Sequence, residues 1–207
     1  MEMRMDSDNG RMWSGMNRAY RAYQQVIHGE VSLSSALCNS SRYQSLKRPN
    51  RRSKHMAKPI PDDYPRVTPY LFVDGAGAAI DFYCSVLGAR ERMRMPGPDG
   101  RIFHAELELG DSMIMLGDQN PEADVRGPHA VGGTPMMMHV YVEDADSVFE
   151  RAIAAGAKAL RQPEDQFYGD RSGRFEDPFG HRWDVATHVE DVGPDEMGRR
   201  AGAITAG

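Results

Sequence analysis

Imidazole and carboxylate side chains recur in several short segments, at the two-residue spacing that β-strands impose on side-chain direction. In Ile102–Leu109, His104 and Glu106 alternate with apolar residues and therefore point to the opposite face of the expected strand. His139 and Asp184 alternate in the same way within two later segments. Groups of these types transfer protons and bind borderline or hard divalent ions. The sequence therefore offers acid–base chemistry and metal binding.

The strands that would hold these residues belong to an order of elements that occurs twice. The first copy has an apolar strand, a helix that Asp74 can cap and Gly88 ends, and three more strands. In the second copy Asp144 starts the helix and Gly156 ends it. A repeat of this size predicts two structural copies around a shared core. The expected strands are 67–73, 90–95, 102–109 and 112–116, then 136–142, 158–162, 171–175 and 181–188.

Charge divides the chain near residue 55. Residues 1–55 contain ten Lys or Arg and four Asp or Glu, whereas all 207 residues together have a net charge of −5. The basic segment is also rich in Ser, Asn and Met, a composition that does not repay the entropy cost of folding. A solvated, disordered leader is the simplest interpretation, and a contact with nucleic acid or a membrane is the alternative. We expect this leader at 1–55 and a folded domain at 56–207, with modules at about 64–120 and 132–190 and a short C-terminal tail.

Composition excludes several classes of protein. Hydrophobic residues make up 40% of the chain and charged residues 27%, which is typical of a globular protein. No apolar run approaches the roughly 18 residues that cross a bilayer. The acidic net charge argues against a dedicated nucleic-acid binder, and two cysteines cannot form a disulfide framework. We therefore expect a cytoplasmic protein whose partners include neither nucleic acid nor a membrane.

Six motifs follow one another in a fixed order along the chain. They are T-P-Y-L-F-V-D at 68–74, F-H-A-E-L at 103–107, G-G-T-P at 132–135, H-V-Y-V-E-D at 139–144, Q-F-Y-G-D-R-S-G at 166–173 and D-P-F-G-H-R-W at 177–183. With this ordered set the sequence resembles the vicinal oxygen chelate superfamily of glyoxalases, bleomycin resistance proteins and dioxygenases, and most closely its PhnB-like branch. The resemblance implies an α+β fold in which two βαβββ modules form a cupped mixed sheet.

A ligand inside the cup is what this resemblance implies, and strand alternation selects the side chains that face it. Glu106 and His104 are candidate bases for proton transfer. Tyr168, in the F-Y-G-D-R segment, is expected at the rim of the pocket. The other side chains expected to line the pocket combine apolar bulk with a few polar groups, as ligand pockets do. They are Tyr70, Phe72, Met113, Met115 and Tyr141.

Metal-dependent members of the superfamily carry their ligands on the first and last strands of each module. Of the four matching positions here, His139 and Asp184 are competent ligands for a divalent metal ion, whereas the tyrosine and methionine at the other two are poor ones. His104 and Glu106, on a neighbouring strand, could complete a displaced site. The four matching positions are Tyr70, Met115, His139 and Asp184.

Each of these residues also has a structural interpretation. His139 can be a hydrogen-bonded histidine. Asp184 can form an ordinary ion pair with Arg182 or Arg94. The methionines can fill irregular gaps in the core.

Two functions remain open at this point. The first is a glyoxalase-like enzyme, a lyase or dioxygenase in which His139 and Asp184 hold the metal ion and Glu106 or His104 moves protons. The second is a non-catalytic protein that sequesters a drug or metabolite in a metal-free pocket. A purely structural scaffold fits the polar residues less well. For either function we expect a small-molecule ligand and a homodimer. The superfamily resemblance implies the dimer, and the open edges of a cupped sheet favour pairing.

Overall fold

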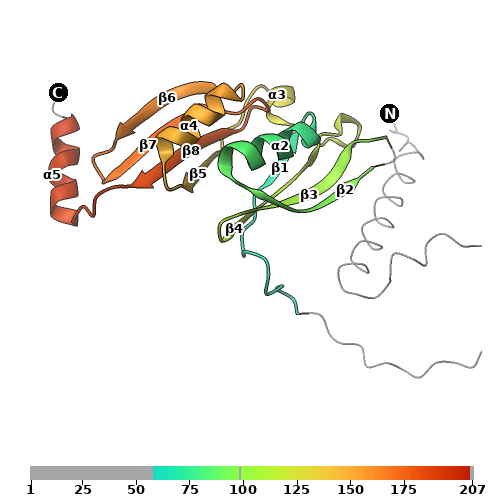
Figure 1. Cartoon of the computed structure of the whole chain (residues 1–207), viewed down its shortest axis with the longest axis horizontal. Coiled ribbons are helices and arrows are strands. Elements are labelled where there is room, and N and C mark those ends of the chain that lie inside the picture. The colour runs from blue at the N-terminus through green and yellow to red at the C-terminus, as the bar shows by residue number, and fades with distance from the viewer. Residues whose placement is uncertain (1–57, 98, 206–207) are drawn as a thin grey trace, which may run out of the picture. The chain divides into compact units, whose positions relative to one another are not determined.

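Two four-stranded sheets, each packed against one long helix, account for most of the folded chain (Figure 1). The computed structural model describes residues 58–97 and 99–205. The leader expected at 1–55 lies outside these residues.

The first module runs from Tyr70 to Asp118. Its strand order is β1-β4-β3-β2, with β1 parallel to β4 and the other neighbours antiparallel. Its elements are β1 (Tyr70–Val73), α2 (Ala76–Leu87), β2 (Arg90–Pro96), β3 (Ile102–Leu109) and β4 (Ser112–Asp118).

The second module runs from Met137 to His188 and repeats this topology as β5-β8-β7-β6, with β5 parallel to β8. The duplicated βαβββ pattern and the α+β class predicted from the sequence are therefore confirmed. The elements of the second module are β5 (Met137–Tyr141), α4 (Ala145–Ala154), β6 (Lys158–Asp165), β7 (Asp170–Glu176) and β8 (Arg182–His188).

Three further helical elements were not expected from the sequence. A 3-10 helix, η2 (Pro121–Ala123), and a short helix, α3 (Pro128–Val131), connect the two modules. The chain then continues past β8 into α5 (Pro194–Thr205), where only a short tail was predicted. None of the helices in the described part of the chain is long and apolar enough to span a membrane.

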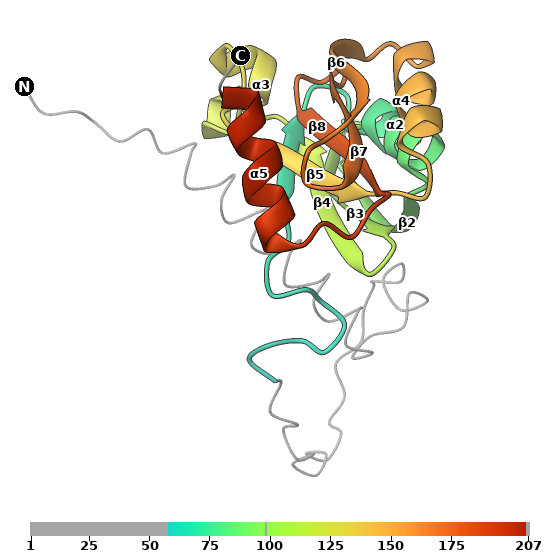
Figure 2. The same ribbon diagram turned by 90° about the vertical axis from the view of Figure 1, so that its left-hand side faces the viewer.

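One hydrophobic core serves both modules. Helices α2 and α4 lie on the same side of the sheets (Figure 2) and contact each other. The largest side chains that are fully buried come from both modules and include Tyr83, Leu71, Leu107, Phe175 and Trp183. The predicted shared core is thus present.

A buried carboxylate fastens the modules together. Asp177, in the turn before β8, accepts hydrogen bonds from the Tyr83 hydroxyl at 2.7 Å and from the Trp183 indole nitrogen at 2.9 Å. Its other oxygen accepts the backbone N–H groups of Phe179 and His181, each at 2.9 Å. Because Tyr83 belongs to α2, the D-P-F-G turn of the second module is tied to the helix of the first.

The two long helices are capped differently. Asp144 caps α4 as predicted, accepting the Ser147 backbone N–H at 3.0 Å. For α2 the prediction of Asp74 is wrong, because the N-cap is Gly75 in the left-handed region at φ 90°. The N–H groups of Gly75 and Ala76 instead donate to Asp118, at 2.9 and 2.8 Å. The capping carboxylate therefore comes from the end of β4, 42 residues away from the helix start in sequence.

Candidate functional site

Each sheet has a core face that packs on its helix and a far face that points the other way. Strand register aligns the side chains of the far face in rows across the sheet. In the first module one row contains Tyr70, Met115, Glu106 and Met93. In the second module the row contains His139, Asp184, Arg174 and Arg161.

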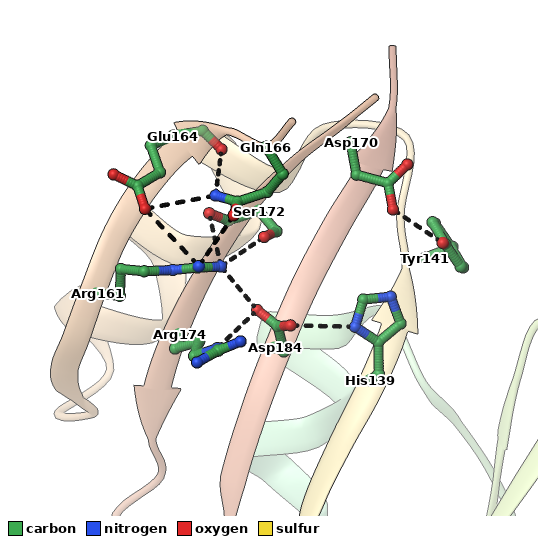
Figure 3. A network of polar contacts seen from close by, with 9 residues as sticks. All are labelled: His139, Tyr141, Arg161, Glu164, Gln166, Asp170, Ser172, Arg174 and Asp184. Carbon is green, nitrogen blue, oxygen red and sulfur yellow. Dashed lines mark hydrogen bonds and ion pairs between the residues drawn. The ribbon is translucent and has the colours of Figure 1, made fainter. Parts of the chain in front are cut away.

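Asp184 is the centre of the row in the second module (Figure 3). Its carboxylate is buried, with only 3% of the residue exposed. One oxygen lies 3.2 Å from His139 Nδ1, and the other lies 3.4 Å from Arg161 Nη2 and 3.4 Å from Arg174 Nε. One acid is therefore shared by an imidazole and two guanidinium groups. The sequence predicted that Asp184 would pair with Arg182 or Arg94. This prediction is wrong, because Arg94 pairs with Glu91 and Arg182 with Glu176.

Neighbouring side chains hold Arg161 in place. Its Nη2 donates to the Ser172 hydroxyl at 2.6 Å, and its Nη1 donates to Gln166 Oε1 at 3.2 Å. Glu164 lies 3.7 Å from the same Nη1 and is mostly exposed. The guanidinium of Arg161 is thus oriented by three groups besides Asp184 (Figure 3).

A second buried acid, Asp170, lies at the start of β7. It accepts hydrogen bonds from the Tyr141 hydroxyl at 2.9 Å and from His188 Nδ1 at 2.8 Å. The hydrogen bond to Asp170 raises the pKa of the Tyr141 phenol. Hydrogen bonds to Asp170 and Asp191 raise the pKa of His188. Tyr141 is 62% exposed as a residue, and its ring meets the His139 ring edge-on, with centroids 4.9 Å apart.

The first module holds a hydrogen-bonded chain on its far face. Glu106 is buried and accepts the Tyr64 hydroxyl at 2.9 Å, while His104 Nε2 lies 3.2 Å from the same carboxylate. His104 Nδ1 lies 3.0 Å from the Tyr70 hydroxyl. If His104 donates from Nε2 to the carboxylate, its Nδ1 accepts from Tyr70. This chain can pass a proton between Tyr70 and Glu106, but both candidate bases are engaged by neighbours.

The predicted pocket residues divide between the two far faces. In the first module the rings of Tyr70 and Phe72 are 4.9 Å apart, and Met113 and Met115 lie on the same face. In the second module Tyr141 lies beside His139, and the predicted ligand pair of His139 and Asp184 is indeed adjacent. Tyr168 lies in the turn between β6 and β7, with its ring 5.2 Å from that of Phe167.

The groups around Asp184 do not suit a divalent cation. Two guanidinium groups lie within 3.4 Å of one of its oxygens, and their positive charges oppose a metal ion there. In the first module Tyr70 and Met115 occupy the matching positions. Within residues 58–97 and 99–205, no group of three or more His, Cys, Asp or Glu side chains is placed to hold a metal ion. A site for a divalent ion would also need three or four protein ligands.

Sequence reasoning missed the two arginines that define this site. Arg174 alternates with the buried Phe175 on β7, and this signal could have placed it on the far face beside Asp184. Arg161 was harder to place, because register shifts flank it on both sides in the pairing of β6 with β7.

Comparison with known proteins agrees with this architecture. The sequence profile of the Glyoxalase/Bleomycin resistance protein/Dioxygenase superfamily matches residues 63–185. The chain belongs to this superfamily. The family predicted from the motifs is therefore confirmed.

The similar proteins include one relative in sequence and three solved structures. An uncharacterized protein of Mycobacterium bovis is 43% identical over 136 residues, which cover 64% of this chain and 90% of that protein. The structure of PA1353 from Pseudomonas aeruginosa is 23% identical with a TM-score of 0.50, covering 61% of this chain and 99% of its own. TioX from Micromonospora sp. ML1 is 29% identical with a TM-score of 0.48, covering 60% and 99%. A PhnB protein from Bacillus cereus is 18% identical with a TM-score of 0.49, covering 59% and 99%.

Proposed function

We propose that this chain is a small-molecule-binding protein that takes its ligand on the far face of the second module without a metal ion. The observation that carries the proposal is the position of Asp184. The one acid that the superfamily resemblance assigns to a metal is occupied by Arg161 and Arg174. A buried carboxylate that already pairs with two guanidinium groups attracts a further cation only weakly, because their positive charges repel it.

The side chains around Asp184 support binding of an organic molecule. Tyr141 and Met137 are 62% and 42% exposed on β5, although both are large and apolar over much of their surface. Beside them lie the oriented polar groups of His139 and Arg174. Exposed apolar surface next to a few fixed polar groups is the usual composition of a ligand site.

A glyoxalase-like enzyme is the second candidate, and the first module supplies the observation that favours it. The chain from Tyr64 through Glu106 and His104 to Tyr70 joins a buried carboxylate to a phenol that is 39% exposed. Such a chain could move a proton to or from a bound molecule. The enzyme therefore stays the alternative to simple sequestration.

The proposal also includes a homodimer in the cytoplasm. Edge strand β5 carries exposed Met137 and Tyr141, and open edges with apolar side chains favour pairing with a second copy. Light scattering at micromolar concentration is expected to give twice the mass of 23.1 kDa. A monomer mass at that concentration would contradict the dimer.

The metal-free proposal is tested by elemental analysis and by binding of Nile red, a neutral apolar dye. We expect no stoichiometric metal in purified protein and the same dye affinity with and without EDTA. Tyr141→Ala should weaken binding of the dye several-fold, because a large exposed ring is removed from the site. Val131→Ala is the matched control, since Val131 is 61% exposed but lies in α3. A stoichiometric metal whose removal abolishes dye binding would overturn the proposal in favour of the enzyme.

A further inference from the structure

The guanidinium of Arg174 makes few polar contacts, and the acid that it contacts is shared with Arg161. Its one polar side-chain contact within residues 58–97 and 99–205 is the 3.4 Å approach of Nε to Asp184. Its two terminal nitrogens have no acceptor among those residues, and the side chain is 41% exposed. The terminal nitrogens of Arg161, by contrast, donate hydrogen bonds to Ser172 and Gln166 as well as to Asp184.

The charges around Asp184 leave Arg174 without a counter-ion of its own. Asp184 is shared with Arg161 and His139, and Glu164 balances only Arg161. In the adjacent row, Glu176 pairs with Arg182.

The remaining acid on this face does not supply a counter-ion either. Asp170 is engaged by Tyr141 and His188. Each acid on the far face therefore has another partner, and Arg174 offers a half-exposed guanidinium whose two terminal nitrogens have no acceptor in the described part of the chain.

His139 provides a second polar group in the same row. Its Nδ1 is directed to Asp184, and no hydrogen-bond partner for its Nε2 occurs in the described part of the chain. Its ring lies against the exposed ring of Tyr141. Strands β5 and β7 flank β8, so about 10 Å separates the strand that carries His139 and Tyr141 from the strand that carries Arg174.

We propose that the ligand of this face is a small organic acid whose carboxylate pairs with Arg174 and whose apolar or aromatic part packs on Tyr141. The inference rests on the proposed binding function and adds the chemical class of the ligand. A guanidinium fork matches a carboxylate with two parallel hydrogen bonds, which a neutral amide cannot reproduce. A molecule the size of a bicyclic aromatic acid spans the distance between the two strands.

The test uses 2-naphthoate and 2-naphthamide, which share a ring system and differ in charge. Calorimetry at low salt is expected to give about tenfold tighter binding of the naphthoate, the size of one charge-assisted hydrogen bond at a half-exposed site. Arg174→Gln should remove this preference and leave naphthamide binding unchanged. Arg182→Gln, the control, removes the same charge from the adjacent row and should keep the preference. Tyr141→Ala should weaken the binding of both compounds by the same factor.

Each contrary result has a distinct meaning. Equal binding of the two compounds to the native protein would overturn the organic-acid inference while the metal-free binding proposal stands. Equal loss of preference in Arg182→Gln would also overturn it, because net charge and not Arg174 would then select the acid. Failure of naphthamide and Nile red alike to bind would overturn the proposed function itself.

A second variant keeps the test decisive if Arg174→Gln does not fold. Arg174→Lys retains the positive charge beside Asp184 but not the fork, so we expect it to keep only part of the tenfold preference. Full retention of the preference in this variant would overturn the paired contact with the guanidinium.

Discussion

The two modules share a backbone plan but place different chemistry on corresponding strands. In the first, the acid of the central row is Glu106 on β3. It accepts a hydrogen bond from Tyr64, lies beside His104, and has one arginine, Arg92, at 3.8 Å. In the second, the acid is Asp184, one strand over on β8, and two of its partners are arginines.

Because the acid lies on a different strand in each module, the two far faces differ in the ligand that they can bind. In the first module Tyr64 and His104 join the acid in a hydrogen-bonded chain that can pass a proton. In the second module two guanidinium groups share the acid, and the terminal nitrogens of Arg174, which have no acceptor among the described residues, can bind an anion. The duplication thus preserves the fold while the two faces differ in chemistry.

The largest expected effect comes from removing Asp184. In Asp184→Ala, Arg161 and Arg174 lose the carboxylate that they share, and we expect a loss of about 3 kcal/mol in the free energy of unfolding. Met115→Ala, at the matching position of the first module, should cost about 1 kcal/mol because Met115 is only partly buried. Urea denaturation measures both values. Equal losses in the two variants would contradict the claim that Asp184 holds an ion-pair network that Met115, at the matching position, does not.

A smaller effect is expected where the modules meet. Tyr83→Phe removes the hydroxyl that donates to buried Asp177, and we expect a loss of about 1–2 kcal/mol with a single unfolding transition. Two separate transitions in calorimetry would show that the modules do not share one cooperative core.

The strand pattern and the duplication could be predicted because alternation and turn residues are local signals. The bounds of β3, 102–109, are those expected from alternation alone. The contact of Tyr64 with Glu106 joins residues 42 positions apart, and the orientation of Arg161 depends on a register shift. Neither has a local signature, so the faces of the strands could be predicted but the partners of the acids could not.

The smallest expected effect is a pH dependence that separates two histidines. Burial lowers the pKa of His181, whose Nε2 donates to the Phe72 carbonyl at 3.2 Å near Asp177 and His129. Because its folded pKa lies below the unfolded value of about 6.5, the stability that neutral His181 contributes is present above that pH and is lost as pH falls. His188 has a raised pKa, so its contribution is present at lower pH and is lost as pH rises through the folded pKa.

Urea denaturation at pH 5.5 and 7.5 measures this difference. Relative to the native chain, His181→Asn should lose less stability on acidification, and His188→Asn should lose more. The same change in both variants would contradict the opposite pKa shifts.

The central claim is that the far face of the second module selects an anion and not a metal ion. Its most direct test is the melting temperature of EDTA-treated native protein after separate addition of 2-naphthoate, Zn²⁺ and Mn²⁺. A ligand at 100 times its Kd stabilises the folded state by about 2.7 kcal/mol, so the naphthoate should raise the melting temperature by several degrees. Neither metal ion should do so. A rise with Zn²⁺ or Mn²⁺ that disappears in Asp184→Ala, with none from naphthoate, would contradict the claim.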